Sequence, residues 1–334
     1  MTEPAGLETR PANPPPYNRL PDSRQLFTLA HLSDPHLAGW PLPGPRAIAN
    51  KRAFGLLSWQ LRRRRIHLSG VLAALSEDLR KATPDHTVIT GDIVNISLPE
   101  EFARATQWLG AFGTSEALTV IPGNHDAYID LPWDETIGNW RCYMRDEPTA
   151  GATGTPFEGQ DDFPFVRRRG RIALIGTSSA CAMPIRSAGG RLGAPQIERL
   201  RRLLDELGKE NLFRIVLIHH PPFEDRHHRR KELEDITELR AAIAASGAEL
   251  MLHGHTHRSS LNRIAVPEGT APVIGVASAS ARAWGNKDPA RYHLYRIEPA
   301  GDGWRVEVEV RTVAVTLDRF ERTGGFRLDV PLAA

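Results

Sequence analysis

Carboxylate, imidazole and amide side chains recur in five short groups along the 334-residue chain. The groups contain Asp34 and His36, Asp92, Asn124 and His125, His219 and His220, and His255 and His257. Carboxylate and imidazole ligands suit Mn, Fe, Zn and similar divalent ions, and no cysteine is among them. The residue types therefore predict a metal site built from segments far apart in the sequence.

The spacing within the groups indicates what such a site would do. In an extended segment alternate residues point the same way, so the D-x-H pair at Asp34 and the H-x-H pair at His255 are expected to present both side chains on one face. One carboxylate, Asp92, could bridge two ions. Two such ions clamp the attacking and leaving oxygens of a phosphoryl displacement and lower the pKa of a bound water. Gly91, Gly123 and Gly254 precede these residues, where tight turns need a tolerant backbone.

Each group lies just past the end of an expected strand. The expected strands are Leu26–Leu32, His86–Thr90, Ala117–Ile121, Arg171–Gly176, Phe213–Ile218 and Leu250–Leu252. Amphipathic helices are expected at Leu68–Lys81, Pro99–Phe112, Ala194–Lys209 and Leu233–Ala245, since their apolar residues recur every three or four positions. This alternation predicts an α/β fold with a sheet covered on both faces, and ligands bind at the carboxyl ends of such strands.

The domain limits follow from composition. Residues 1–24 are rich in proline and polar residues and are expected to be a tail without fixed structure. One domain is expected over 25–318, followed by a C-terminal tail at 319–334. After residue 258 alternating segments at Ala271–Ala277, Arg291–Ile297 and Trp304–Val315 predict antiparallel strands that complete a second sheet.

The motifs SDPH (33–36), GDIVN (91–95), GNHD (123–126), HH (219–220) and GHTH (254–257) resemble those of the calcineurin-like metallophosphoesterase superfamily, in the family's order. The resemblance implies a two-sheet β-sandwich flanked by helices, in αββα layers, and two divalent ions. It implies one metal held by Asp34, His36, Asp92 and His257, and a second held by Asn124, His219, His255 and the shared Asp92. His125 would contact the phosphate or protonate the leaving oxygen, and Asp126 would orient His125. The compact layout and the HHPP segment resemble bacterial class III cyclic-nucleotide and glycerophosphodiester phosphodiesterases most.

Together, the motifs and this resemblance predict a metal-dependent phosphoesterase, in particular a phosphodiesterase that uses a metal-bound hydroxide. The competing hypothesis is an inactive relative that serves as a protein-binding scaffold. Such relatives have lost ligands or the GNHD histidine, whereas every position is filled here. His31 and His253 are expected to have structural roles, and His67 and His86 to lie at the surface or to cap elements. His220 is a candidate substrate-binding residue with an equal claim to a structural role.

A long connection at 37–66 leaves the metal-bearing edge and contains Trp40, Trp59 and Arg62–Arg65. It could be a cap over the substrate, with Trp40 or an arginine in contact with it, or a packed helical hairpin with solvated arginines. We favour these two over an anionic-membrane contact through residues 51–65 and over a nucleic-acid contact, which would make the protein a nuclease.

The overall composition also limits the type of protein and the partners that the chain could have. The chain is 41% hydrophobic and 25% charged, with a formal net charge of +2, so charge alone indicates no polyanionic partner. Cys142 and Cys181 are the only cysteines. Two free thiols suit a reducing compartment, although one disulfide is compatible with the sequence.

We find no signal sequence or membrane span and expect a cytoplasmic protein, with peripheral attachment to the inner membrane face left open. Cyclic nucleotides, glycerophosphodiesters, phospholipid-derived esters and nucleic-acid ends all remain candidate substrates.

Overall fold

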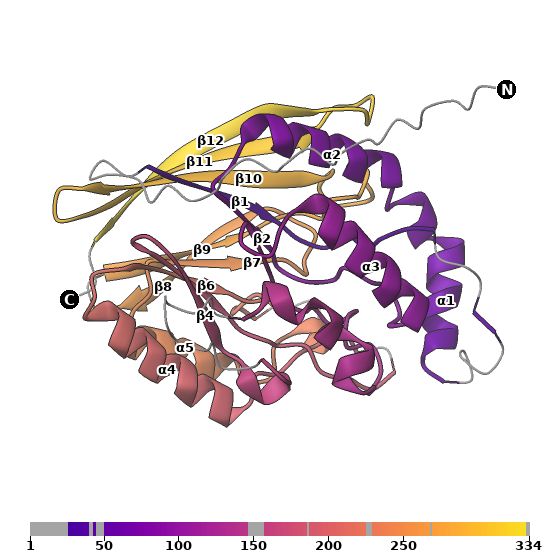
Figure 1. Cartoon of the computed structure of the whole chain (residues 1–334), viewed down its shortest axis with the longest axis horizontal. Helices are drawn as coiled ribbons and strands as arrows, with labels where there is room; N and C mark the ends of the chain where they lie inside the picture. The colour runs from indigo at the N-terminus through magenta and orange to yellow at the C-terminus, as the bar shows by residue number, and fades with distance from the viewer. Residues whose placement is uncertain are drawn as a thin grey trace, which may run out of the picture.

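The computed structural model describes residues 26–39, 43–44, 50–145, 157–185, 187–224, 229–267 and 269–331. Two six-stranded sheets face each other, with helices on their outer faces (Figure 1). This is the two-sheet sandwich that the sequence predicts. The predicted tail at 1–24 and the candidate residue Trp40 lie outside the described residues.

The first sheet has the strand order β12-β11-β10-β1-β2-β3. Its strands are β1 (Phe27–Leu32), β2 (His86–Ile89), β3 (Leu118–Val120), β10 (Arg291–Ala300), β11 (Gly303–Val313) and β12 (Phe320–Pro331). β1, β2 and β3 are parallel, with Leu32 opposite Ile89. β10 runs antiparallel to β1, and β11 and β12 continue the antiparallel pairing. The carboxyl ends of β1, β2 and β3 therefore meet at one edge.

The second sheet has the order β4-β5-β6-β7-β9-β8. Its strands are β4 (Phe165–Arg169), β5 (Ile172–Gly176), β6 (Phe213–Leu217), β7 (Leu250–His253), β8 (Ser260–Val266) and β9 (Gly269–Gly275). β5, β6, β7 and β9 are parallel, and β4 and β8 run antiparallel at the two ends. The apolar side chains of β6 alternate: Ile215 joins the core between the sheets, and Val216 packs under the helices. Strands buried on both faces need such continuous apolar runs.

Helices cover the outer faces of both sheets (Figure 1). α2 (Ser69–Ala82) and α3 (Pro99–Phe112) pack on the first sheet, and α4 (Ala194–Gly208) and α5 (Ile236–Ser246) pack on the second. α4 buries Ile197, Leu200 and Leu204 along one stripe, as its three- and four-residue spacing requires. The short 3₁₀ helices are η2 (Arg63–Arg65), η3 (Trp133–Glu135), η4 (Ile137–Tyr143), η5 (Gln160–Asp162) and η6 (Arg229–Lys231).

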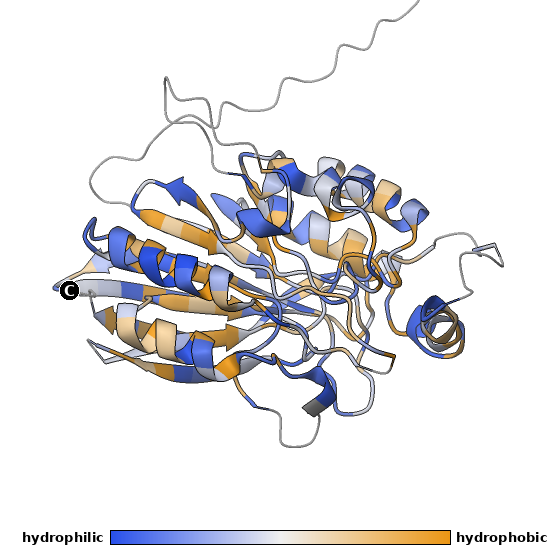
Figure 2. Cartoon of the chain, turned by 90° about the horizontal axis from the view of Figure 1, so that it is seen from below, coloured by the Kyte–Doolittle hydropathy of each residue, from blue (hydrophilic) through white to orange (hydrophobic). Residues whose placement is uncertain are grey.

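One further helix, α1 (Arg52–Leu61), comes from the 37–66 connection. Figure 2 shows it end-on at the edge of the molecule, apart from the two sheets. Arg52 anchors it, because its buried guanidinium donates to the carbonyls of Ile96 and Ser97. No helix within the described ranges is both long enough and apolar enough to cross a membrane.

Two predictions about the C-terminal third are wrong. β10 and β11 extend the first sheet beside β1 and do not complete the second. The predicted tail at 319–334 contains β12, which pairs with β11 along its length. Phe320, Leu328 and Val330 of β12 are buried, and this burial holds the strand in place. Cys142 and Cys181 both carry free thiols.

Candidate metal centre

The predicted ligands meet where the carboxyl ends of β1, β2, β3, β6 and β7 come together. Several contacts join the two sheets at this point, and two of them involve the backbone. The His219 ring lies after β6 and contacts the Thr90 carbonyl after β2, with Nδ1 2.7 Å from the oxygen. The His255 amide after β7 donates to Asp34 Oδ2 after β1 over 3.0 Å. The five motifs therefore share one site, as predicted.

The first group of ligand atoms contains Asp34, His36, Asp92 and His257. His257 Nε2 lies 3.1 Å from Asp34 Oδ1, and His36 Nε2 lies 3.7 Å from Asp92 Oδ2. One ligand atom from each of Asp34, His36 and His257 lies within 4.8 Å of the other two. Asp34, His36 and Asp92 are buried, and an isolated buried carboxylate is costly without a cation or donor beside it.

The second group contains Asn124, His219 and His255. Asn124 Oδ1 lies 2.9 Å from His255 Nδ1 and 3.2 Å from His219 Nε2. Asp92 Oδ2 lies 3.5 Å from His219 Nε2, so this one oxygen approaches both groups. Burial alone would lower the pKa of His219, but Asp92 and Asp34 raise this pKa to about 9. A cation is thus favoured beside Asp92.

Two of the imidazoles are already oriented for ligation. His36 Nδ1 lies 3.2 Å from the Val94 carbonyl, and His219 Nδ1 contacts the Thr90 carbonyl. A carbonyl only accepts, so each Nδ1 carries a proton and each Nε2 faces the site, where a metal ion would take the place of any proton on it. His36 Nε2 is buried without a hydrogen-bond partner among the described residues. Such an orphaned ring nitrogen is what a bound cation would satisfy, so these residues fit a divalent metal.

The backbone at the ligands corrects one prediction. Asp34, His36, Asp92, His255 and His257 all have positive φ, between 41° and 66°. The D-x-H and H-x-H pairs are therefore not extended, and their side chains converge through left-handed turns. Gly91, with φ of 94°, shows why glycine is needed at one of these turns, because a Cβ there would lie 2.5 Å from the Gly123 nitrogen.

His125 lies beside the ligands and does not need to act as one. Its Nδ1 is 2.5 Å from the Asn95 carbonyl, so Nδ1 donates and Nε2 accepts. Arg63 Nη2 lies 2.8 Å from that Nε2. Burial, followed by the charge of Arg63, lowers the pKa of His125 to about 3. Arg63 was not singled out from the sequence; only the arginine run of the connection indicated that some arginine could reach the substrate.

Asp126 does not orient His125, so that prediction is wrong. Its Oδ2 accepts from the amides of Asp92 and Gly123, both over 2.8 Å. Its Oδ1 accepts from the amides of Ile93 and Val94 over 2.9 and 3.0 Å. The carboxylate therefore fixes the two loops that carry Asp92 and Asn124, and its effect on the site is through the backbone.

The remaining histidines do not all have the positions that were predicted for them. His220 donates from Nε2 to the Ala188 carbonyl and accepts at Nδ1 from Ser179, so both ring nitrogens are used inside the protein. These contacts support the structural role that the sequence left open, and contact of His220 with the substrate stays a prediction. His31 and His253 are buried, in line with the structural roles expected of them. His67 and His86, expected at the surface or as caps, are also buried.

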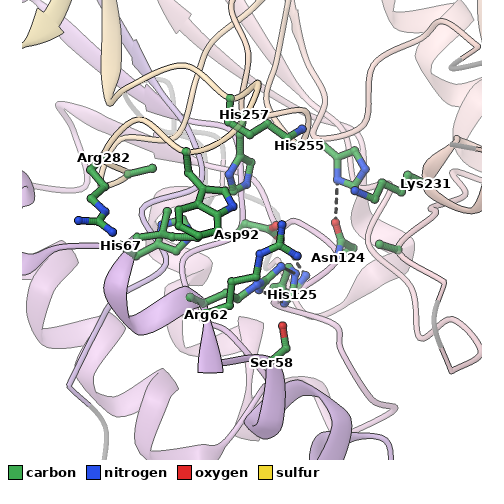
Figure 3. Close-up of a pocket in the computed structure, with 16 residues that line it drawn as sticks. Ser58, Arg62, His67, Asp92, Asn124, His125, Lys231, His255, His257 and Arg282 are labelled. Carbon is green, nitrogen blue, oxygen red and sulfur yellow. Dashed lines mark hydrogen bonds between the residues drawn. The ribbon is translucent and has the colours of Figure 1, made fainter. Parts of the chain in front are cut away.

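An open cavity of about 240 Å³ lies over the ligands. Asp92, Asn124, His125, His255 and His257 form its floor (Figure 3). Its walls include residues that the sequence analysis did not select, namely His67, Lys231, Arg282, Trp284 and Lys287. No motif marks them: His67 and Lys231 come from separate segments, and the other three share the loop between β9 and β10 without a recognisable spacing. Ser58, Arg62 and Arg63 from the 37–66 connection also line it, which agrees with the predicted cap.

Comparison with known families gives a match to the family described as calcineurin-like phosphoesterase over residues 27–259, well over half of the chain. A probable cyclic nucleotide phosphodiesterase from Synechococcus is 22% identical over 248 residues, which cover 71% of this chain and 80% of that protein. The glycerophosphodiester phosphodiesterase GpdQ of Enterobacter lignolyticus is 54% identical over 43 residues only, 13% of this chain and 15% of that relative.

Among solved structures, a dimetal phosphatase from Danio rerio superposes with a TM-score of 0.58. It is 12% identical, and the match covers 92% of this chain and 99% of that one. At this identity the likeness concerns the fold alone, and it agrees with two mixed sheets flanked by helices.

Proposed function

Because the chain belongs to the calcineurin-like phosphoesterase family and is a phosphoric ester hydrolase, we propose that it cleaves phosphodiesters at a pair of divalent metal ions. The observation that carries the proposal is the position of Asp92 Oδ2, 3.7 Å from His36 Nε2 and 3.5 Å from His219 Nε2. One carboxylate oxygen between two ligand groups is the arrangement that a bridged metal pair requires.

The chain's own residues define how the metals would be held. Asp34, His36 and His257 would hold one ion, Asn124, His219 and His255 the other, and Asp92 both. When bound, such a pair polarises the phosphate and makes a water oxygen nucleophilic near neutral pH. Mn, Fe and Zn all suit this ligand set.

His125 and Arg63 complete the proposed reaction centre. Hydrolysis joins the water oxygen to phosphorus, breaks one P–O ester bond and returns a proton to the departing alkoxide. His125 Nε2 and Arg63 Nη2 both face the cavity floor. Arg63 is placed to bind a non-bridging phosphate oxygen, and His125 to contact the same oxygen or to assist the leaving one.

Replacing Asp92 or Asn124 by alanine tests the proposal. Each variant should abolish metal-dependent hydrolysis of bis(p-nitrophenyl) phosphate, because each removes a ligand from the shared centre. Asp302→Ala and Asn262→Ala are matched controls at exposed positions on the β10–β11 turn and on β8. Full activity in either ligand variant would refute the assignment.

The scaffold hypothesis makes the opposite prediction for the wild-type protein. A protein-binding relative without activity would show no turnover with Mn, Fe, Co, Ni or Zn supplied. Elemental analysis of the purified protein, with the same measurement on Asp92→Ala, separates the two cases. Close to two metal ions per chain supports the proposal, and none after reconstitution contradicts it.

A second candidate function places the reaction at an anionic membrane surface. Phe54, Leu57 and Leu61 of α1 are 53%, 54% and 68% exposed and recur at helical spacing. Arg64 and Arg65 follow them, and residues 35–76 contain no acidic side chain. Apolar and basic side chains on one short element suit the headgroup region of a bilayer. Co-sedimentation with phosphatidylglycerol vesicles should therefore fall in Leu57→Gln/Leu61→Gln, and equal pelleting of variant and wild type would count against the candidate.

A further inference from the structure

His67 lies at the edge of the proposed metal centre and lines the cavity over it. Its ring packs against two of the proposed ligands, with ring centres 4.6 Å from His36 and 5.6 Å from His257. None of the groups of potential ligand atoms found among the described residues includes His67. The side chain is therefore an imidazole beside the centre that does not need to bind the ions itself.

The backbone around His67 is fixed from two directions. Its amide donates to the Arg63 carbonyl over 2.9 Å, so Arg63 and His67 are one helical turn apart. On the other side, His67 forms a β-bridge with Ala281 in the loop between β9 and β10. Side chains four residues apart on a helical turn emerge on the same face, and both Arg63 and His67 line the cavity. One short turn thus presents two polar side chains to the same opening.

The hydrogen bonds of the His67 ring show which of its nitrogens can donate. Nδ1 lies 2.8 Å from the Ser280 hydroxyl oxygen. That hydroxyl is 3.4 Å from the hydroxyl of Ser278, which itself donates to the Asp34 carbonyl over 2.7 Å. Because the shorter contact is the better hydrogen bond, Ser280 donates to Nδ1 of the ring. The ring then carries its proton on Nε2.

Nε2 of His67 is open to the cavity. This atom has no hydrogen-bond partner among the described residues, yet it is not one of the fully buried unpaired atoms. Figure 3 shows His67 on the same side of the cavity as Arg282, away from Asn124 and Lys231. The residue as a whole is only 3% exposed. A donor so poorly hydrated and without a protein partner is stabilised when a ligand oxygen accepts from it.

The surroundings of Nε2 indicate which ligand oxygen this is. The His36 ring packs edge to face against both His67 and His125, with ring centres 4.6 and 5.0 Å apart. Arg63, one turn before His67, places its guanidinium at His125 on the cavity floor. A phosphate bound over His36 would therefore lie beside both imidazoles and the guanidinium. Phosphate oxygens only accept, so they match an N–H donor at this position.

We propose that His67 binds the substrate, and that its Nε2–H donates a hydrogen bond to a phosphate oxygen of the phosphodiester. This inference rests on the proposed phosphodiesterase function and adds a further substrate-contacting residue to it. Arg63 and His67 would then hold one phosphate through two side chains of a single turn. The bond between the His67 amide and the Arg63 carbonyl keeps the two side chains in register.

Two substitutions at His67 separate substrate binding from a structural role. The amide of asparagine replaces Nδ1, so His67→Asn keeps a partner for Ser280 and loses the donor at Nε2. The longer glutamine side chain places its amide near Nε2, so His67→Gln keeps that donor and loses the contact with Ser280. Substrate binding therefore predicts that His67→Gln is the more active variant, whereas a structural role through Ser280 predicts the reverse order.

The assay is steady-state hydrolysis of bis(p-nitrophenyl) phosphate, compared at equal metal content because His67 packs on two proposed ligands. His67→Asn should lower kcat/KM by at least about tenfold, and His67→Gln should keep at least about three times the kcat/KM of His67→Asn. Binding of inorganic phosphate, measured by isothermal titration on the same metal-loaded proteins, should weaken in the same order. His86→Asn is the matched control, a buried histidine outside the cavity lining, and should keep the wild-type kcat/KM.

Three results would overturn the inference. The first is a loss below about tenfold in His67→Asn, and the second is a kcat/KM of His67→Gln that does not exceed that of His67→Asn by about threefold. The third is an equal loss in His86→Asn, since the effect would then follow from removing any buried imidazole. Failure of the proposed function is recognised separately, because then the wild-type protein hydrolyses no bis-ester with any metal, and phosphate binding alone ranks the His67 variants.

Discussion

Arg63 is the residue whose replacement tests the reaction centre most directly. Its Nη2 lies 2.8 Å from His125 Nε2 at the cavity floor, and its side chain is only half-buried, so a substitution there leaves the core intact. A hydrogen bond from a charged group contributes about 1.5–3 kcal/mol. If Arg63 makes that bond to the phosphate in the transition state, Arg63→Gln should lower kcat/KM by about 10- to 150-fold, at about 1.4 kcal/mol for each factor of ten.

The assay is steady-state hydrolysis of bis(p-nitrophenyl) phosphate by metal-reconstituted protein. Arg63→Lys keeps the charge but loses the planar pair of donors, so it should fall between Arg63→Gln and the wild type. Added guanidinium should restore part of the rate of Arg63→Gln, since the ion can occupy the vacated position. A residue with a purely structural role would show no such rescue.

Arg65→Gln serves as the control, because Arg65 is exposed, belongs to the same arginine run and does not line the cavity. Its kcat/KM should match the wild type. A rate for Arg63→Gln within about threefold of the wild type would mean that Arg63 contributes under 1 kcal/mol, and the phosphate-binding role would be refuted. An equal loss in Arg65→Gln would refute it too, since the effect would then come from net charge.

Two further predictions concern stability. Burial lowers the pKa of His293 to about 4 from its ordinary value of 6.5. Because the folded state binds the proton less readily than the unfolded state, stability is lost as the pH falls from 6.5 through 4, and the 2.5-unit difference corresponds to about 3 kcal/mol. His293→Gln should remove that part of the pH dependence in urea titrations, and an unchanged pH slope would contradict the assignment. Glu249 pairs with the buried Arg214 over 2.8 Å. Glu249→Ala should lower the free energy of unfolding by about 3–5 kcal/mol, since it leaves an uncompensated buried charge, and a loss below about 1 kcal/mol would show that the pair is unimportant.

Much of the fold could be predicted because the local signals and the tertiary structure agree. α3 was predicted at Pro99–Phe112, and the structure has it there. β12 was missed because it lies at the edge of the first sheet with one face in solvent. Its sequence, FERTGGFRLDVP, has charged residues and a pair of glycines among few apolar ones, and Phe320, Leu328 and Val330 become buried only against β11 and the core. A weak apolar pattern of this kind resembles that of a tail.

At the site, the residues with metal-ligand chemistry could be predicted and the cavity walls could not. The ligands follow strands in short motifs, so order and spacing identify them. Lys231 lies in a run of charged residues and Arg282 lies in a loop, and the sequence surroundings of both match those of any solvated side chain. Asp126 shows a second reason why the sequence could not predict the whole site. Its place beside His125 in the sequence suggested a contact, but adjacent side chains diverge, and its oxygens accept from four backbone amides.

The backbone of the ligands leads to a last prediction, on metal removal. Five of the seven proposed ligands have positive φ, a conformation that costs other residues about 1–3 kcal/mol when nothing compensates for it. Asp34 and Asp92 are also buried, and His257 with other nearby imidazoles holds the pKa of Asp34 below its ordinary value against the effect of burial. A bound cation would compensate for both costs, so metal should bind the folded state and stabilise it.

At a free Mn²⁺ concentration about 100 times the dissociation constant, the stabilisation is about 2.7 kcal/mol for one site. Chelator-treated protein should therefore melt at a lower temperature than Mn²⁺-loaded protein, and Asp92→Asn should lose most of the difference because both sites share that carboxylate. Equal melting temperatures with and without Mn²⁺, when elemental analysis shows the sites filled, would mean that the left-handed turns are held by the loops alone.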